Sequence, residues 1–414
     1  MQNGVLGCAF LASLSLHAQQ PIILEYSIPT PQSLPGSITQ GPDGNLWFTE
    51  TAANKIAKIT PLGSITEYVL PTEDSRPNGI AQGPDGNLWF TEPGSNKIGK
   101  VTPTGAITEY PVPNAPWHIT AGPDGNLWFT GRTGTISKIT ISGVVTEYPV
   151  ASTTGPGNIT QGSDGNIWFT EAYKVGKITA DGLVTEYPLS DSPSSDYDRQ
   201  LDAIALGSDG NIWATAGGAT WRIGMTGAST FYPTPSQYWG TPGIAPGLNG
   251  SLWFTELYGN NVARITTDGV IHEYAIPTSK AFPNGIVQGP DGNIWFTEQA
   301  GNKIGVIVLS SLPVDPLLVL SSSSLSFSAN AEPQVLSVSS AVPANFQCYA
   351  RSFGPWLNIS PADGLHTDQQ IVVSVNLARL PRGTGPYAGA ISLTSGDVTQ
   401  TVPVTFKLAA PTPD

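Results

Sequence analysis

The chain has 414 residues, of which only 12% are charged, together with 46 glycines, 37 prolines and a formal net charge of −13. A chain so rich in turn-forming Gly and Pro favours an all-β fold. The acidic balance, with no basic run, argues against a nucleic-acid partner, because phosphate binding needs clustered Lys and Arg.

The N-terminus has the pattern of an export signal, so we expect a signal peptide over residues 1–18 and a secreted or periplasmic protein. The apolar run at 5–16 is too short to span a bilayer, and we expect no membrane span elsewhere.

Two alternatives stay open at this end of the chain. No Lys or Arg precedes the apolar run, so the start codon could be misplaced, and Cys8 could be lipidated. If Cys8 is removed, Cys348 has no partner and is expected to be a buried thiol.

A repeat of about 40 residues follows. The pattern Asp-Gly-Asn-Leu/Ile-Trp recurs at spacings of 42, 39, 40, 45, 40 and 42 residues. Its seven copies, one of them degenerate, begin at Asp43, Asp85, Asp124, Asp164, Asp209, Asn249 and Asp291. A β-rich period of this length corresponds to one four-stranded blade. We therefore predict an all-β fold with a seven-bladed β-propeller over residues 21–310.

One repeat predicts strands at 79–83, 88–91, 97–102 and 106–111, with a tight turn at Asp85-Gly86. The first Glu-Tyr motif, at Glu25-Tyr26, precedes every core motif. The N-terminal strand should therefore complete the last blade as its outer strand, which closes the ring. The seven repeat tryptophans are expected to pack between blades. The Glu of each Glu-Tyr is expected to be solvated, and so are Lys55, Lys97, Lys174 and Lys303 on the third strands.

After a proline-bearing linker at 311–317 the period is lost. Short alternating runs predict an Ig-like β-sandwich over 318–410. The stretches 356–364, 371–376 and 385–389 resemble the bacterial BACON-type Ig-like domains, and this resemblance implies a role in glycan binding. Trp356 is expected to be a core residue rather than a platform for a sugar.

Propeller geometry places the start of each first strand beside the end of the second strand, at one rim of the channel. The paired positions are Gly36/Glu50, Asn78/Glu92, Trp117/Gly131, Gly157/Glu171, Asp202/Ala216, Pro242/Glu256 and Asn284/Glu298. We expect these carboxylates and amides to converge on one mouth, where they would attract a cation or raise each other's pKa. The alternative is that each Glu binds nearby backbone N–H groups.

The connections that cross this rim carry aromatic residues, namely Tyr197 within 190–200, Tyr238 with Trp239, and Trp117 beside His118. Aromatic rings next to carboxylates and amides suit a sugar or a cyclic organic ligand, although they would also cap the blades. The predicted ligand-binding residues are Asn78, Glu92, Trp117, His118, Trp239 and Asn284. One rim histidine is too few for a nucleophilic triad, whereas a carboxylate acid/base pair stays open.

The repeat Gly-Pro-Asp-Gly-Asn-Leu-Trp-Phe-Thr-Glu, with Ile-Thr-Glu-Tyr-Pro, resembles the streptogramin lyases over about residues 21–310. The resemblance implies a seven-bladed propeller that eliminates across an ester C–O bond of a cyclic streptogramin B, with Mg²⁺ and a histidine base. The family has Glu-Pro-His-Gly-Ile where this chain has Phe282-Pro283-Asn284-Gly285-Ile286, and Pro242 stands at a second histidine position.

When the family's functional positions are matched to this chain, the resemblance implies that Glu298 is the catalytic candidate. It implies that Glu298 and Glu256 are candidate metal ligands. Asn284 cannot act as the base, because an amide has no basic form near neutral pH. Three hypotheses stay open, because a fold alone does not transmit function. The first is a monomeric recognition protein that binds a small polar, cyclic or glycan-like ligand. The others are a C–O lyase that uses Glu298, a metal and His118, and an extracellular scaffold.

Overall fold

The computed structural model describes residues 21–407 except 133, 151–154, 173, 190–200, 237–239, 248–249, 312–317, 323, 329–331, 341–344, 353–355, 362–364, 367–368, 381–386 and 396–397. The predicted export signal, Cys8, Tyr197, Tyr238, Trp239 and most of the predicted linker lie outside these residues, as does the side chain of Cys348. Within the described chain, no helix has the length and apolar character needed to cross a bilayer.

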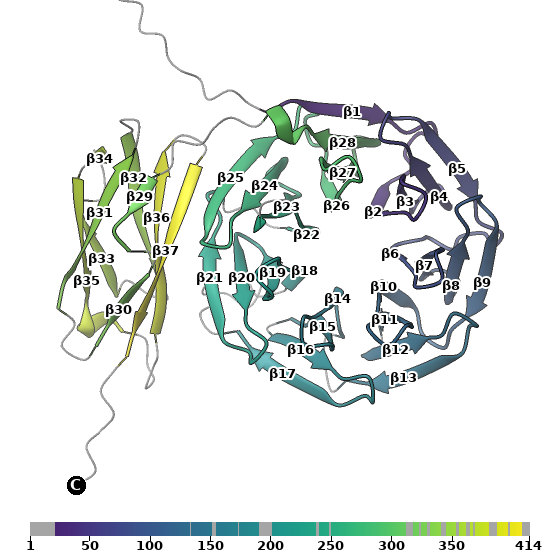
Figure 1. Cartoon of the computed structure of the whole chain (residues 1–414), viewed down its shortest axis with the longest axis horizontal. Helices are drawn as coiled ribbons and strands as arrows, with labels where there is room; N and C mark the ends of the chain where they lie inside the picture. The colour runs from purple at the N-terminus through teal and green to yellow at the C-terminus, as the bar shows by residue number, and fades with distance from the viewer. Residues whose placement is uncertain are drawn as a thin grey trace, which may run out of the picture.

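Seven antiparallel sheets of four propeller strands form a ring around a central opening (Figure 1). Blade one contains β2 (Pro35–Gln40), β3 (Leu46–Glu50), β4 (Lys55–Ile59) and β5 (Ile65–Val69), and blade two contains β6 (Ile80–Gln82), β7 (Leu88–Glu92), β8 (Lys97–Val101) and β9 (Ile107–Pro111). Blade three contains β10 (Pro116–Ala121), β11 (Leu127–Gly131), β12 (Thr135–Ile139) and β13 (Val145–Pro149), and blade four contains β14 (Ile159–Gln161), β15 (Ile167–Thr170), β16 (Lys174–Ile178) and β17 (Val184–Pro188). Blade five contains β18 (Leu201–Leu206), β19 (Ile212–Ala216), β20 (Ala219–Ile223) and β21 (Ser229–Pro233), and blade six contains β22 (Ile244–Pro246), β23 (Leu252–Glu256), β24 (Asn261–Ile265) and β25 (Val270–Ala275).

The seventh blade closes the ring with strands from both ends of the propeller. It contains β26 (Pro283–Gln288), β27 (Ile294–Glu298) and β28 (Lys303–Ile307), and β1 (Ile23–Ser27) pairs antiparallel with β28. Tyr26 lies opposite Ile304 in this ladder. The predicted closure by the N-terminal strand is therefore confirmed.

Each Asp-Gly-Asn-x-Trp motif forms the turn between the first two strands of a blade. In blade two, Asp85 Oδ1 accepts hydrogen bonds from the Trp89 indole N–H at 3.0 Å and from the Asn87 backbone N–H at 3.3 Å. Gly86 has a φ of +73°, a conformation that favours glycine. The motif thus fixes both the turn and the tryptophan rotamer.

The repeat tryptophans are almost completely buried between blades, as predicted. Trp47 packs against Leu88 and Phe90 of the next blade. It also stacks on Tyr68 of its own outer strand at 5.5 Å, and the Lys58 ammonium lies 5.2 Å from the indole. Because each indole fills the gap to the following blade, the seven sheets form one continuous core.

The C-terminal part contains two packed sheets. One consists of β29 (Leu318–Leu320), β31 (Gln334–Ser340), β35 (Gln369–Val375) and β33 (Leu357–Ser360). The other contains β34 (Leu365–His366), β32 (Asn345–Ser352), β36 (Tyr387–Ser395) and β37 (Val398–Phe406), with β30 (Leu325–Phe327) beside β37. Two short 3-10 turns, η2 (Leu309–Ser311) and η3 (Leu377–Arg379), complete the described elements. Trp356 is fully buried in the core between the sheets, as predicted.

Candidate functional site

The first strands of the seven blades surround the central opening (Figure 1), and those of neighbouring blades contact one another. The Asn78 side-chain N–H donates to the Trp117 carbonyl of the next blade at 2.9 Å. Asp202 accepts from the backbone N–H of Thr241 at 2.8 Å and from its hydroxyl at 3.0 Å. The predicted rim positions 78 and 117 are therefore joined directly, and Asp202 is hydrogen-bonded to the residue that precedes Pro242.

A set of buried threonines fixes the backbone of this rim. Thr297 Oγ1 accepts from the Gly285 N–H of its own blade at 2.9 Å and donates to the Gly36 carbonyl of the first blade at 2.7 Å. The same donation to the following blade is made by Thr49, Thr91, Thr215 and Thr255. Sequence reasoning missed this role, although a Thr follows two residues after the Trp in all seven repeats.

The second-strand glutamates do not line the mouth, which corrects the prediction. Glu50, Glu92, Glu171, Glu256 and Glu298 are 0–3% exposed. Successive side chains of a strand alternate between its faces, so Glu298 shares a face with Ile294 and Phe296. That face packs against the preceding blade. Each glutamate therefore lies inside an interface between blades.

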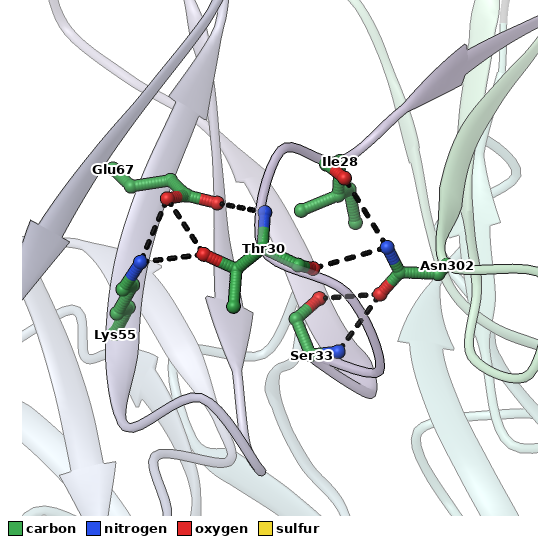
Figure 2. A network of polar contacts seen from close by, with 6 residues as sticks. All are labelled: Ile28, Thr30, Ser33, Lys55, Glu67 and Asn302. Atoms are coloured by element: carbon green, nitrogen blue, oxygen red, sulfur yellow. Dashed lines mark hydrogen bonds and ion pairs between the residues drawn. The ribbon is translucent and has the colours of Figure 1, made fainter.

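The outer-strand glutamates and third-strand lysines are also not simply solvated, contrary to expectation. The Lys55 ammonium lies 2.7 Å from the Glu67 carboxylate, and Glu67 accepts from the Thr30 backbone N–H at 2.9 Å and from its hydroxyl at 2.8 Å (Figure 2). Thr30 belongs to the connection from blade seven, so the network joins two blades. Equivalent ion pairs are Lys97–Glu109, Lys174–Glu186 and Lys303–Glu25.

Each buried glutamate thus has a second carboxylate nearby. Burial, followed by repulsion from Glu67, raises the pKa of Glu50 to about 8. Burial and the Glu25 carboxylate likewise raise the pKa of Glu298 to about 8, even though Lys303 acts in the opposite direction. Burial would also raise the pKa of Glu67, but its hydrogen bonds with Lys55 and Thr30 lower it overall. At neutral pH Glu50 and Glu298 are therefore protonated, whereas Glu67 is ionised.

Blade five shows that the set of one buried glutamate, one lysine and one outer-strand glutamate contributes to packing between blades. The register places Ala216, Ala219 and Phe231 where blade one has Glu50, Lys55 and Glu67. Trp221 occupies the position of Ala57 and packs in the core between blades four and five. An apolar cluster has thus replaced two carboxylates and an ammonium, which points to a structural role for Glu256 and Glu298.

The predicted magnesium site does not fit these side chains. Glu298 is buried beside Glu25 and Lys303, and Asn284 and Phe282 stand at the matched family positions. Among the described residues no group of three or more His, Cys, Asp or Glu side chains could hold a metal ion. No chemical step through a metal is therefore assigned to this rim.

An aromatic and cationic cluster lies at the start of blade three. The Arg132 guanidinium lies 3.9 Å from the centre of the Trp117 ring, and Trp117 contacts His118 edge to face at 5.9 Å. Burial lowers the pKa of His118 to about 4, so its imidazole is neutral at pH 7 and can both donate and accept a hydrogen bond. Trp117 and His118 were predicted, whereas Arg132 was not.

A second aromatic pair lies on the same rim, where blades six and seven meet. Tyr258 is 61% exposed and contacts Phe282 edge to face at 5.8 Å. Phe282 has a positive φ of +53°. Leu34 and Arg76, which also directly precede a proline at the start of the next two blades, have φ angles of +50° and +52°. Non-glycine residues rarely adopt a positive φ, so this backbone conformation costs each of the three residues some energy.

Comparison with known proteins agrees with this architecture. The Virginiamycin B lyase family model matches residues 13–219 and 195–312. A solved streptogramin B lyase is 37% identical, with a TM-score of 0.66, and the match covers 70% of this chain and 98% of the other.

Virginiamycin B lyase from Staphylococcus aureus is 34% identical over 69% of this chain and 99% of its own, with a TM-score of 0.64. A catalytically inactive histidine-to-alanine variant of that enzyme, solved with quinupristin, matches to the same extent. The present chain belongs to the Virginiamycin B lyase family.

Proposed function

We propose that the propeller binds a small polar, cyclic ligand at its channel mouth without opening the ligand's ring. The Trp117–His118–Arg132 cluster carries this proposal. It combines an indole with a guanidinium whose edge can still donate and a neutral imidazole. The structure of the S. aureus variant with quinupristin supports a ligand of that size.

The side chains at the matched reaction positions favour binding over elimination. Asn284 cannot remove a proton from carbon near neutral pH, because its amide has no basic form there. Phe282 offers no metal ligand. Glu298 is fully buried, and its raised pKa keeps it protonated below about pH 8.

The test is a titration of the protein with quinupristin, followed by tryptophan fluorescence or calorimetry and by chromatography of the ligand. We expect saturable binding with an intact ligand, and at least a tenfold weaker affinity for Trp117→Ala. Leu62→Ala, at an exposed turn on the periphery, is the matched control and should bind normally. No binding, or equal binding by Trp117→Ala, would overturn the proposal.

The second candidate is a streptogramin B-type C–O lyase, favoured by the 37% identity to such an enzyme. In this alternative His118, neutral at pH 7, would be the base at the rim. Mg²⁺-dependent appearance of linearised quinupristin, abolished by His118→Ala, would establish the lyase. An unchanged ligand after prolonged incubation would exclude this substrate.

A further inference from the structure

The outer strand of blade six is part of a larger sheet. In β25, Val270, Ile271 and His272 pair antiparallel with Gln400, Thr399 and Val398 of β37. The Thr401 backbone N–H extends this ladder by donating to the Gly269 carbonyl at 3.3 Å. Figure 1 shows the C-terminal sheets lying against β25 and β21, and contacts between β21 and both β36 and β37 agree.

The alternation of hydrogen bonds in an antiparallel ladder identifies which amides face the domain junction. The Thr266 N–H donates to the Val270 carbonyl inside blade six, so the N–H of the next residue, Ile271, points outward. Thr401 points its N–H toward β25, and Thr399, two residues earlier, has the same orientation. Ile271 and Thr399 are therefore the hydrogen-bonded pair at the centre of the junction.

The sequence of β25 departs from the other outer strands where the contact occurs. His272 is 3% exposed, whereas the matching threonines of blades one to four, Thr66, Thr108, Thr146 and Thr185, are exposed. Ile271 is fully buried, whereas its counterparts Ile65, Ile107, Val145 and Val184 are only half-buried. A larger, buried side chain thus stands where the repeat otherwise presents threonine to solvent.

From this we infer that β37 docks the C-terminal domain on blade six by strand addition, so that the two domains form one rigid body. Blade six is specialised for this docking, and its partner is the chain's own C-terminal domain. A free outer strand edge is a site for unwanted pairing, and β37 occupies this one. The junction also leaves a cavity of about 560 Å³, lined by Arg222 and Asp268 of the propeller and by Ser324 and Thr405 of the C-terminal domain.

Hydrogen exchange of the full-length chain tests the docking. The Ile271 amide should exchange at least tenfold more slowly than the outward-facing amides of Ile65 and Ile107, which lie on outer strands with no added strand in the described structure. Equal exchange at these three amides would overturn the inference, and this comparison needs no variant.

A backbone substitution provides the matched pair of variants. Thr399→Pro removes the N–H that donates to the Ile271 carbonyl and places a proline ring against β25, which prevents the ladder that protects the Ile271 amide, while Thr399→Ala keeps this N–H. We expect Thr399→Pro to abolish the protection at Ile271 and Thr399→Ala to retain it. Amides of β31 and β35, in the other sheet of the C-terminal domain, report whether that domain stays folded. Unchanged protection at Ile271 in a folded Thr399→Pro variant would contradict docking through this ladder.

Discussion

The protonated state of the buried glutamates predicts an unusual pH dependence of stability, tested by Glu298→Gln. The folded pKa of Glu298 is about 8, and the ordinary value is 4.5. Between these values the folded state holds a proton that the unfolded chain releases. The free energy of unfolding therefore falls as pH rises, by about 1.4 kcal/mol per pH unit for one carboxyl. The stabilisation is complete below about pH 4.5 and is lost as pH approaches 8.

Glutamine has the shape of the protonated acid and stays neutral at every pH. Glu298→Gln should therefore gain stability relative to the natural chain as pH rises, by roughly 3 kcal/mol between pH 5.5 and 7.5. Denaturant unfolding at the two pH values measures this difference, in which the other titrating groups cancel. Glu73→Gln, at an exposed acidic residue, is the control and should show no such gain.

An equal loss of stability at both pH values would refute the reasoning. It would mean that Glu298 is ionised and that its attraction to Lys303 outweighs burial and the Glu25 charge. Glu50→Gln repeats the test in blade one, because the pKa of Glu50 is also raised to about 8.

Further predictions concern the closure of the ring. Thr297→Val should cost about 1–3 kcal/mol of unfolding free energy, because it leaves the Gly36 carbonyl and the Gly285 N–H without their partner; denaturant titration measures this. Trp295→Ala should cost about 3–5 kcal/mol by opening a cavity between blades seven and one, which calorimetry would detect. Deleting residues 21–27 should lower the melting temperature and expose the β28 edge, seen as faster hydrogen exchange at Lys303 to Ile307.

Much of the fold could be predicted because each copy of the sequence repeat corresponds to one blade. The regular Asp and Trp positions predict the blade count, and the unmatched Glu-Tyr at Glu25-Tyr26 predicts which strand closes the ring. The position of Glu298 at a strand end was also predicted, but not the face on which it lies. Alternation along the strand puts Glu298 on the face of Ile294 and Phe296, but both faces of this strand are buried, so only the packing shows that this end does not open on the rim.

The rest of the site depends on tertiary contacts that one sequence does not reveal. Arg132 follows a strand that lacks the usual glutamate, and its partner Trp117 lies 15 positions earlier. Nothing in the spacing distinguishes a stacked guanidinium from a solvated one. The pairing of β25 with β37 joins segments about 130 residues apart, and the only local sign was His272 in place of the repeat threonine.

Comparison of the seven blades separates structural from functional positions. Thr and Trp recur in every blade and serve packing, whereas the first-strand position at the rim holds Gly36, Asn78, Trp117, Gly157, Asp202, Pro242 and Asn284. The threonine hydrogen bonds fix the backbone there, so the side chain is free to vary. The Asn284 carbonyl, for example, accepts from Thr255 at 2.7 Å whatever side chain the residue carries.

This independence makes Asn284→His combined with Phe282→Glu an informative exchange. Both changes restore residue types of the family pattern at a rim whose backbone should not move, so unfolding free energy should change by less than about 1 kcal/mol. Pro242, at the second histidine position, is left unchanged. If the natural chain binds a cyclic ester and the residues at 282 and 284 alone prevent elimination, the double variant should linearise quinupristin in the presence of Mg²⁺. Asn284→Gln with Phe282→Leu is the inert control. A stable double variant that binds quinupristin yet leaves it intact would show that the mouth holds the ester out of reach of position 284.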